Sequence, residues 1–281
     1  MLSVVWNIDP VIFSIGPISL RWYGLMWAIG IYLCYLVNVK LYKLENWPVE
    51  WTDHLFIWLT IGAIVGARLG HCLFYEWHDG VNPYLTHPLR LFAVWEGGLA
   101  SHGGALGLFI ASALVYVRYM RTGVVARYGA WARNPYNGMI FVLDRLCIGV
   151  CLCGACIRLG NLMNSEIYGG PTSLPWGFIF VRDGQTVPCH PTQIYEMLYC
   201  LIAFCITYPM FVVGKCYRRP GLIFGVFMQC IFLTRFLLEF IKNNQEAFED
   251  SLMLNMGQIL SIPFILWGLY CIYRALRAPA I

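Results

Sequence analysis

Seven runs of about 20 mostly apolar residues constrain the fold of this 281-residue chain more than any other feature. A transmembrane helix needs about 20 such residues to cross the roughly 30 Å hydrocarbon core of a bilayer. The runs lie at residues 20–39, 54–77, 97–119, 138–158, 192–213, 221–241 and 256–275. The fourth run is the least regular, because Asp144 and Arg145 fall near its start. The pattern predicts an all-α polytopic membrane protein with seven transmembrane helices.

The composition supports a lipid environment. Hydrophobic residues make up 59% of the chain and charged residues only 12%, against about 25% charged in soluble domains. The net charge is +4 and no run of Lys and Arg indicates a nucleic-acid partner. We expect one membrane domain covering residues 1–281, with long connections at 78–96 and 159–191. The first apolar run lacks a basic segment before it, so we expect a retained span rather than a cleaved signal.

The distribution of positive charges predicts the orientation. Cytoplasmic connections of membrane proteins carry an excess of Lys and Arg. Eleven of them fall on one side of the predicted spans: Lys40, Lys43, Arg118, Arg121, Arg127, Arg133, Lys215, Arg218, Arg219, Arg274 and Arg277. The other side carries only Arg21, Arg90, Arg182 and Lys242. The N-terminus is therefore predicted outside, the C-terminus in the cytoplasm, and both long connections on the outer, periplasmic side.

Most of the 12 cysteines lie inside the apolar runs. This placement favours small packing residues over a disulfide framework, whose cysteines are spaced through polar loops. Cys151, Cys153 and Cys156 are close enough in sequence to suggest a metal. A closed zinc site needs four ligands, however, and the sequence offers no fourth one nearby.

Ionisable side chains inside the spans are the strongest functional signal, because such groups are costly in lipid. The orientation predicted above places them in the outer half of the bilayer, with Tyr23 at the outer start of the first span. A shared depth predicts a single polar pocket that opens outward. The residues concerned are Arg68, His102, Arg158, Arg235 and Glu239, with Asn161 and Glu166 just beyond the fourth run.

Three arginines in one layer with few acids indicate an anionic ligand, since a guanidinium binds phosphate through two parallel hydrogen bonds. In a membrane, a phospholipid headgroup is the natural anion at that depth. Arg235 and Glu239 are four residues apart and could instead form a buried ion pair that only holds helices together. That alternative does not explain Arg68 and Arg158, which we expect to lack matching carboxylates.

His102 and two connecting segments each allow two interpretations. His102 lies in the run GGLASHGGALG and is either a general base or part of a glycine-rich seam between helices. The segment RLGNLMNSEIYGG, residues 158–170, is predicted to be a binding loop. The segment PCHPTQIYE, residues 188–196, either adds to the site or starts a helix with Thr192 as its N-cap.

At these residues the chain resembles the prolipoprotein diacylglyceryl transferase family. The similarity covers most of the chain, and the segments follow the order of the family. They are DPVIFSIGPISLRWYGLM at 9–26, ARLGHCLFY at 67–75, WEGGLASHGG at 95–104, RLGNLMNSEIYG at 158–169, HPTQIYE at 190–196, RFLLEF at 235–240 and MGQILSIP at 256–263. Ile157, Leu162, His71 and Ile231 depart from the family pattern; Ile231 stands where a Tyr is often found.

The resemblance implies a seven-span enzyme of the bacterial cytoplasmic (inner) membrane, with its active site toward the outer leaflet. Its substrates would be phosphatidylglycerol and the lipobox cysteine of prolipoprotein peptides. Its products would be a thioether-linked diacylglyceryl lipoprotein and glycerol phosphate. The resemblance implies no metal and no soluble cofactor.

The expected roles follow from the chemistry. A thiol with a pKa near 8.5 must lose its proton to attack, and the leaving phosphate must be stabilised. We expect His102 to act as base or proton relay, Arg158 and Arg235 to clamp the phosphate, and Glu239 to orient Arg235. Headgroup positioning falls to Tyr23, Asn161, Glu166 and Gly169, while Arg68 either binds the headgroup or is structural.

Two other classes of protein fit part of the pattern. Charged residues within spans also mark transporters and channels, although these often show paired repeats with a site at the midplane. A lipid-binding protein without chemistry is the second alternative. Incubating a lipobox peptide with the protein and phosphatidylglycerol separates the three.

Overall fold

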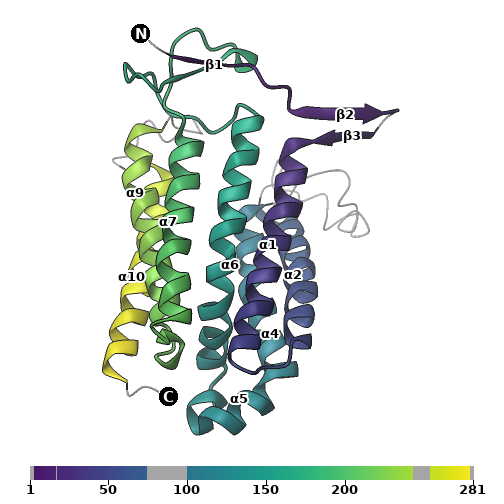
Figure 1. Cartoon of the computed structure of the whole chain (residues 1–281), viewed down its shortest axis with the longest axis vertical. Coiled ribbons are helices and arrows are strands. Elements are labelled where there is room, and N and C mark those ends of the chain that lie inside the picture. The colour runs from purple at the N-terminus through teal and green to yellow at the C-terminus, as the bar shows by residue number, and fades with distance from the viewer. Residues whose placement is uncertain (1–2, 17, 75–99, 243–253, 279–281) are drawn as a thin grey trace. The chain divides into compact units, whose positions relative to one another are not determined.

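The computed structural model describes residues 3–16, 18–74, 100–242 and 254–278, and most of its helices and strands are labelled in Figure 1. The helices are α1 (Trp22–Leu44), α2 (Glu50–Phe74), α4 (Ser101–Val115), α5 (Arg121–Tyr128), α6 (Pro135–Met163), α7 (Thr192–Val212), α8 (Leu222–Met228), α9 (Thr234–Leu238) and α10 (Met256–Arg277). The strands are β1 (Val4–Trp6), β2 (Val11–Ile15), β3 (Ile18–Arg21) and β4 (Phe178–Phe180).

Seven helical segments among the described residues are long and apolar enough to cross a membrane, which confirms the predicted number of spans. Two of them are composite. α4 continues through a π-helical turn at Tyr116–Met120 into α5, and α8 continues through one at Gln229–Leu233 into α9. α1 and α6 run to Leu44 and Met163, several residues beyond the predicted ends. Asn161 therefore lies in the last turn of α6 rather than beyond the span.

The chain forms two compact units. The larger unit contains residues Met1–Leu41 and Asp144–Ile281, and the smaller unit contains Tyr42–Leu143. The helices α1 and α6 each contribute residues to both. The prediction of one domain over 1–281 and the predicted sidedness of the termini stay predictions. The connection at 78–96 lies outside the described residues.

In the smaller unit, α2 and α4 pack through a seam of glycines. A Cβ atom added to Gly66 would lie 2.3 Å from the backbone oxygen of Gly103. A Cβ on Gly107 would lie 1.9 Å from the oxygen of Gly62. Small residues allow such close backbone approach between membrane helices. Gly103 and Gly107, which follow His102 in the glycine-rich run, therefore form a helix-packing surface.

In the larger unit, the acidic residue in the fourth apolar run has a structural function. The Asp144 side chain is fully buried in α6. Its Oδ2 accepts a hydrogen bond from Gly221 N at 2.6 Å, and its Oδ1 accepts one from Phe224 N at 2.8 Å. These are two of the N–H groups at the start of α8 that have no partner within the helix. Asp144 thus caps a neighbouring helix across 77 residues of sequence.

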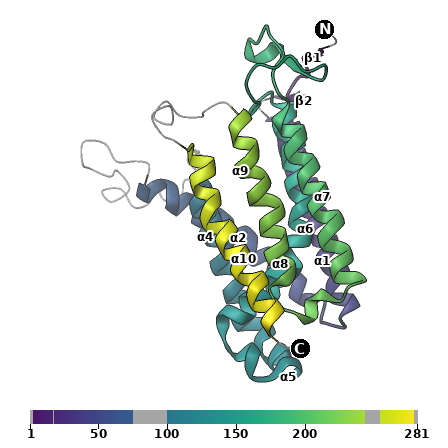
Figure 2. The ribbon, with the colours of Figure 1, turned by 90° about the vertical axis from the view of Figure 1, so that its left-hand side faces the viewer.

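The helix α10 lies along α8 and α9 in the larger unit (Figure 2). A Cβ on Gly225 would lie 2.7 Å from the backbone oxygen of Gly268, so the two helices are in backbone contact. Gln229, in the π-helical turn, donates from Nε2 to the backbone oxygen of Ile265 at 2.9 Å. This packing brings the C-terminal end of α9 to the N-terminal end of α10.

Residues 164–191 form an ordered cap on the larger unit instead of an open loop. β4 pairs in parallel with β1, so the N-terminal strand covers this connection (Figure 1). The indole Nε1 of Trp6 donates to the backbone oxygen of Leu162 at 2.9 Å. Leu162, Phe180 and Cys189 form its buried core. The antiparallel hairpin of β2 and β3 leads directly into α1.

We predict that Gly66→Ala lowers the melting temperature of the detergent-solubilised protein, because its new methyl group would meet the backbone of α4. Gly104→Ala is the matched control on the facing helix, since its Cβ would find its nearest neighbour at an ordinary 3.5 Å. Thermal unfolding followed by circular dichroism measures both. Equal melting temperatures for the two variants would show that the seam tolerates a side chain.

Candidate functional site

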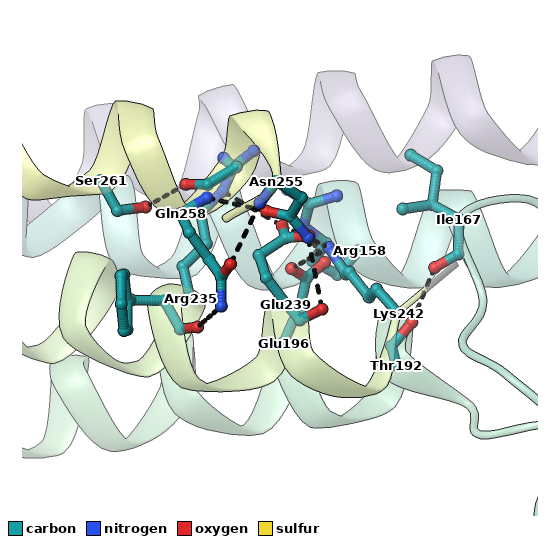
Figure 3. Close-up of polar contacts among 12 residues, drawn as sticks. Arg158, Ile167, Thr192, Glu196, Arg235, Glu239, Lys242, Asn255, Gln258 and Ser261 are labelled. Atoms are coloured by element: carbon teal, nitrogen blue, oxygen red, sulfur yellow. Dashed lines mark hydrogen bonds and ion pairs between the residues drawn. The ribbon is translucent and has the colours of Figure 1, made fainter. Parts of the chain in front are cut away.

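Four helix ends of the larger unit meet at one end of its helix bundle and bring charged residues together (Figure 3). They are the C-terminal end of α6, the N-terminal end of α7, the turn after α9 and the N-terminal end of α10. Alternating chain direction places these ends together although they are far apart in sequence. Figure 3 shows the side chains of Arg158, Glu196, Arg235, Glu239 and Lys242 directed toward one another.

These five side chains form a continuous series of ion pairs. Arg158 Nε lies 2.9 Å from Glu196 Oε2, and Lys242 Nζ lies 2.8 Å from Glu196 Oε1. Lys242 Nζ also lies 3.4 Å from Glu239 Oε1. Arg235 Nε lies 3.6 Å from the same Glu239 oxygen. Arg158 and Arg235, predicted to act together, are therefore joined through three intervening charged groups.

Two expectations at α7 are wrong. Arg158 was expected to lack a carboxylate partner, yet Glu196 pairs with it. The partner comes from another helix, so no local spacing in the sequence could reveal it. Thr192 was expected as a possible N-cap, but the N-cap of α7 is Pro191, without a side-chain cap. Thr192 is the first helical residue, and its Oγ1 donates to the backbone oxygen of Ile167 at 2.8 Å.

The interior of the series is buried and its two ends are accessible. The side chains of Glu196, Lys242 and Glu239 are 0%, 4% and 8% exposed, whereas those of Arg158 and Arg235 are 22% and 37% exposed. Among the described residues, no acceptor contacts the Nη atoms of Arg235 or Nη2 of Arg158. Three cations face two carboxylates. The two guanidinium groups thus offer free N–H donors to an anion.

Asn161 and Glu166 extend the series from Arg158. Arg158 Nη1 donates to Asn161 Oδ1 at 3.2 Å, and Asn161 Nδ2 donates to Glu166 Oε1 at 2.7 Å. Asn164 Nδ2 donates to the same carboxylate oxygen at 3.3 Å. Arg158 and Glu166 are therefore linked through Asn161, while the single polar pocket that also includes Arg68 and His102 stays a prediction.

Glu166 sits in a strained turn. Ser165 and Ile167, its neighbours, have φ angles of +56° and +60°, a region that a β-branched residue such as Ile rarely adopts. The turn is held from α7: Thr192 donates to Ile167 O, and Gln193 Nε2 donates to Glu166 O at 2.6 Å. Strain of this kind persists where the surroundings fix it, and it is frequent at binding sites. This contact is the reason why residues 158–170 and 190–196 belong to one site.

Gly169 is required by a close approach of backbones. Its N–H donates to the oxygen of His190 at 2.8 Å, and it forms an antiparallel bridge with Lys242. A Cβ atom on Gly169 would lie 2.5 Å from the oxygen of Ile241 and 2.9 Å from His190 Cβ. Gly169 therefore brings the turn after α9, and with it Lys242, into the site. Its predicted contact with the headgroup stays a prediction.

Tyr23 lies at the same end of the larger unit. A Cβ on Gly160 would lie 2.9 Å from Tyr23 Cδ2, so the Tyr23 ring packs on α6 at Gly160, within one turn of Arg158 and Asn161. Gly160 leaves room for this ring. The start of α1 is thereby fixed next to the charged cluster.

Arg68 and His102 belong to the smaller unit. Arg68 is buried in α2, with 3% of its surface exposed. The backbone of His102 is in the first turn of α4, and its side chain lies outside the described part of the chain. That either residue shares a pocket with Arg158 and Arg235 stays a prediction.

Sequence reasoning missed Lys242 as a site residue and included Glu196 only as the last residue of the segment 188–196. Lys242 had a usable signal: it follows Glu239 by three residues, which places both side chains on one side of a helical turn. Glu196 is the fifth residue of α7, and an acidic residue near the start of a helix is ordinary. Only its full burial distinguishes it from one.

The cap contains a tyrosine and a cysteine with raised pKa values. Burial, with the hydrogen bond from its hydroxyl to Asp183, raises the pKa of Tyr168 to about 12. Burial also raises the pKa of the Cys189 thiol, which is 2% exposed. Reactive cysteines have lowered pKa values and accessible sulfur atoms. Cys189 is therefore a packing residue, and no group of three or more His, Cys, Asp and Glu in the described residues could hold a metal ion.

The fold and the charged cluster define a multi-pass membrane protein with a polar site at one end of its helices. The family model for prolipoprotein diacylglyceryl transferase matches residues 10–274. The chain belongs to this family.

Three relatives illustrate the similarity, and each bears the name phosphatidylglycerol–prolipoprotein diacylglyceryl transferase. The protein from Porphyromonas gingivalis is 43% identical, over 98% of this chain and 96% of its own. The protein from Tolumonas auensis is 39% identical, over 98% of each chain. The protein from Bacteroides fragilis is 37% identical, over 97% of this chain and 95% of its own. The similarity thus extends over nearly the whole length of both partners.

We predict that Glu196→Gln destabilises the protein by on the order of 3 kcal/mol, because it leaves two buried or half-buried cations short of a carboxylate. Thermal unfolding in detergent measures the change. Glu50→Gln, at an exposed position in the first turn of α2, is the control and is expected to unfold like the wild type. A Glu196→Gln protein as stable as the control would contradict a stabilising role for the ion-pair series.

Proposed function

We propose that this chain transfers the diacylglyceryl group of phosphatidylglycerol to the cysteine thiol of prolipoproteins, the first step of bacterial lipoprotein lipidation. The names of the relatives support the two substrates. One observation supports the site: Arg158 and Arg235 are both held by buried carboxylates and both keep free guanidinium donors. That arrangement suits the phosphate of an anionic lipid.

The ion pairs fix the arginines before the lipid arrives. Each Nε faces a glutamate, which leaves Nη2 of Arg158 and both Nη atoms of Arg235 as donors for a ligand. A donor held in place needs no reorganisation when charge develops in the transition state. Arg158 and Arg235 would bind the phosphate through these edges. Glu239 and Glu196 would hold them there.

The reaction replaces a carbon–oxygen bond by a carbon–sulfur bond. The thiolate sulfur attacks the carbon of the diacylglycerol unit that is bonded to the phosphate oxygen, and this carbon–oxygen bond breaks. The electron pair of that bond leaves with glycerol phosphate, whose growing negative charge the arginines stabilise. The thiol proton must be removed first, and His102 is the proposed base or proton relay.

Tyr23, Asn161, Glu166 and Gly169 are proposed to position the headgroup. Asn161 and Glu166 contact Arg158 directly or through one another, so a lipid phosphate on Arg158 would place its glycerol headgroup beside them. Carboxylate and amide oxygens accept hydrogen bonds from glycerol hydroxyls. Arg68, buried in the smaller unit, is proposed either to add to headgroup binding or to serve packing.

We propose that the site faces the outer leaflet of the bacterial inner membrane. In the larger unit, the helix ends away from the site carry Lys40, Lys215, Arg218, Arg274 and Arg277. An excess of Lys and Arg marks the cytoplasmic side. Phosphatidylglycerol would then enter from the outer leaflet, and the prolipoprotein from its translocated side.

The central test incubates the purified protein with a lipobox peptide and phosphatidylglycerol vesicles. We expect a diacylglyceryl mass gain on the peptide cysteine by mass spectrometry. Arg158→Lys should lose most of the rate, because an ammonium group cannot bind phosphate in the bidentate geometry. Arg182→Lys is the control, since Arg182 pairs with Asp9 on the exposed cap.

A wild-type protein that leaves the peptide unmodified would contradict the proposed transferase. Binding of the lipid without transfer would then favour a lipid-binding protein, and lipid or ion flux across vesicles a transporter. A full rate for Arg158→Lys would reduce Arg158 to a point charge or a structural residue.

The same assay tests the proposed base. We predict that His102→Gln lowers turnover at pH 7 by roughly 100-fold, the usual contribution of a general base. The loss should shrink as pH rises toward the thiol pKa, because solvent then supplies the thiolate. Near-wild-type turnover at pH 7 would instead assign thiol activation to the positive charge of the arginines.

A further inference from the structure

The first turn of α10 lies against Glu239 and has no function in the scheme above. It belongs to the segment MGQILSIP, residues 256–263, and begins at its N-cap, Asn255. Glu239 is 8% exposed and pairs through Oε1 with both Lys242 and Arg235. Its second oxygen, Oε2, accepts a hydrogen bond from the side-chain amide of Asn255 (Figure 3).

Asn255 does more than cap its helix. Its Oδ1 accepts from Gln258 N at 2.9 Å, and Gln258 Oε1 accepts from Asn255 N at 3.1 Å, which completes a capping box. Ser, Thr or Asp would cap as well. The amide nitrogen Nδ2 makes separate contacts, because it donates to Glu239 Oε2 and to the backbone oxygen of Glu239, both at 3.3 Å. An ionised Asp would cap the helix but has no proton to donate, whereas the amide of Asn255 caps the helix and donates to the carboxylate at the same time.

Gly257 allows the carboxylate to approach the helix. A Cβ atom at this position would lie 2.5 Å from Glu239 Cδ and 2.6 Å from its Oε1. The residue has no positive φ and lies in a helix, where Ala is preferred over Gly. Conformation therefore does not require glycine here. The space occupied by the Glu239 carboxylate does.

Gln258 links the first turn of α10 to the backbone of α9. It is 3% exposed, and its Nε2 donates to the backbone oxygen of Phe236 at 3.4 Å. Phe236 adjoins Arg235 in α9. The first turn of α10 thus contacts both the backbone beside Arg235 and the side chain that pairs with it.

We propose that Asn255 and Gly257 are positioning residues for the transfer reaction: they hold the Glu239 carboxylate so that its other oxygen orients Arg235 and Lys242. Asn255 takes one carboxylate oxygen, and the two cations share the other. With both oxygens engaged from different helices, the carboxylate cannot rotate. The inference rests on the proposed function, because it assigns a role within that site.

The test is a double-mutant cycle between Gly257→Ala and Glu239→Asp in the transfer assay. We expect Gly257→Ala to lower kcat by roughly 100-fold with a smaller change in KM, as misplacement of a catalytic group does. Glu239→Asp shortens the side chain by one methylene and makes room for the new methyl group. The double variant should therefore be at least tenfold more active than the product of the single effects predicts.

Gly268→Ala is the matched control on the same helix. Its Cβ would lie 2.5 Å from Gln229 Nε2, an equally close contact away from Glu239. It should combine with Glu239→Asp without coupling.

Asn255→Ser keeps the cap but removes the amide donor. We expect it to unfold at the wild-type temperature and to lose at least tenfold in kcat.

Additive effects of Gly257→Ala and Glu239→Asp, or coupling equal to that of Gly268→Ala, would overturn the inference. So would wild-type kcat for Asn255→Ser. If the wild-type protein transfers no lipid, the proposed function fails and the positioning role fails with it. In that case, the melting temperatures of the same variants test whether Gly257 and Glu239 are in contact. Non-additive changes in melting temperature would support the contact, and additive changes would overturn it.

Discussion

The pairing of a fully buried carboxylate governs the architecture of the site. Glu196 has no exposed surface, and a buried charge is tolerated only when opposite charges and hydrogen bonds compensate it. Arg158 and Lys242 supply that compensation from the ends of two other helical segments. Once Glu196 is placed, the ends of α6, α7 and α9 must meet. The two arginines at the rim then keep the donors that the interior does not use.

Close backbone packing makes this meeting possible. Gly160 admits the Tyr23 ring, Gly169 admits the turn that carries Lys242, and Gly257 admits the Glu239 carboxylate. At each position the missing side chain is replaced by a neighbour that belongs to the site. Helix propensity would favour alanine at two of these positions. The glycines are thus explained by contacts between segments rather than by local conformation.

The features that could be predicted depend on residues close together in the sequence, and those that could not depend on contacts between distant segments. Span number follows from local apolar length, so seven spans were predicted correctly. Asn161 and Glu166 were expected in one pocket with Arg158, which they follow by three and eight residues. Asp144 was counted against its span, although it caps α8 across 77 residues. Glu196 was not recognised as the partner of Arg158 for the same reason: the contact joins separate helices.

The sequence by itself determined that the chain is a seven-span membrane protein and that it resembles one family, and it singled out Arg158 and Arg235 as candidate site residues. These properties depend on residue type and on spacing within a segment. In a bilayer, an apolar run of about 20 residues must form a helix, because its backbone hydrogen bonds have to be satisfied within the segment. Only the tertiary structure decided which carboxylate meets which arginine, and that Lys242 and α10 join the site. Partner choice depends on how helices rotate and where their ends stop. Both are set by packing between segments that no local pattern encodes.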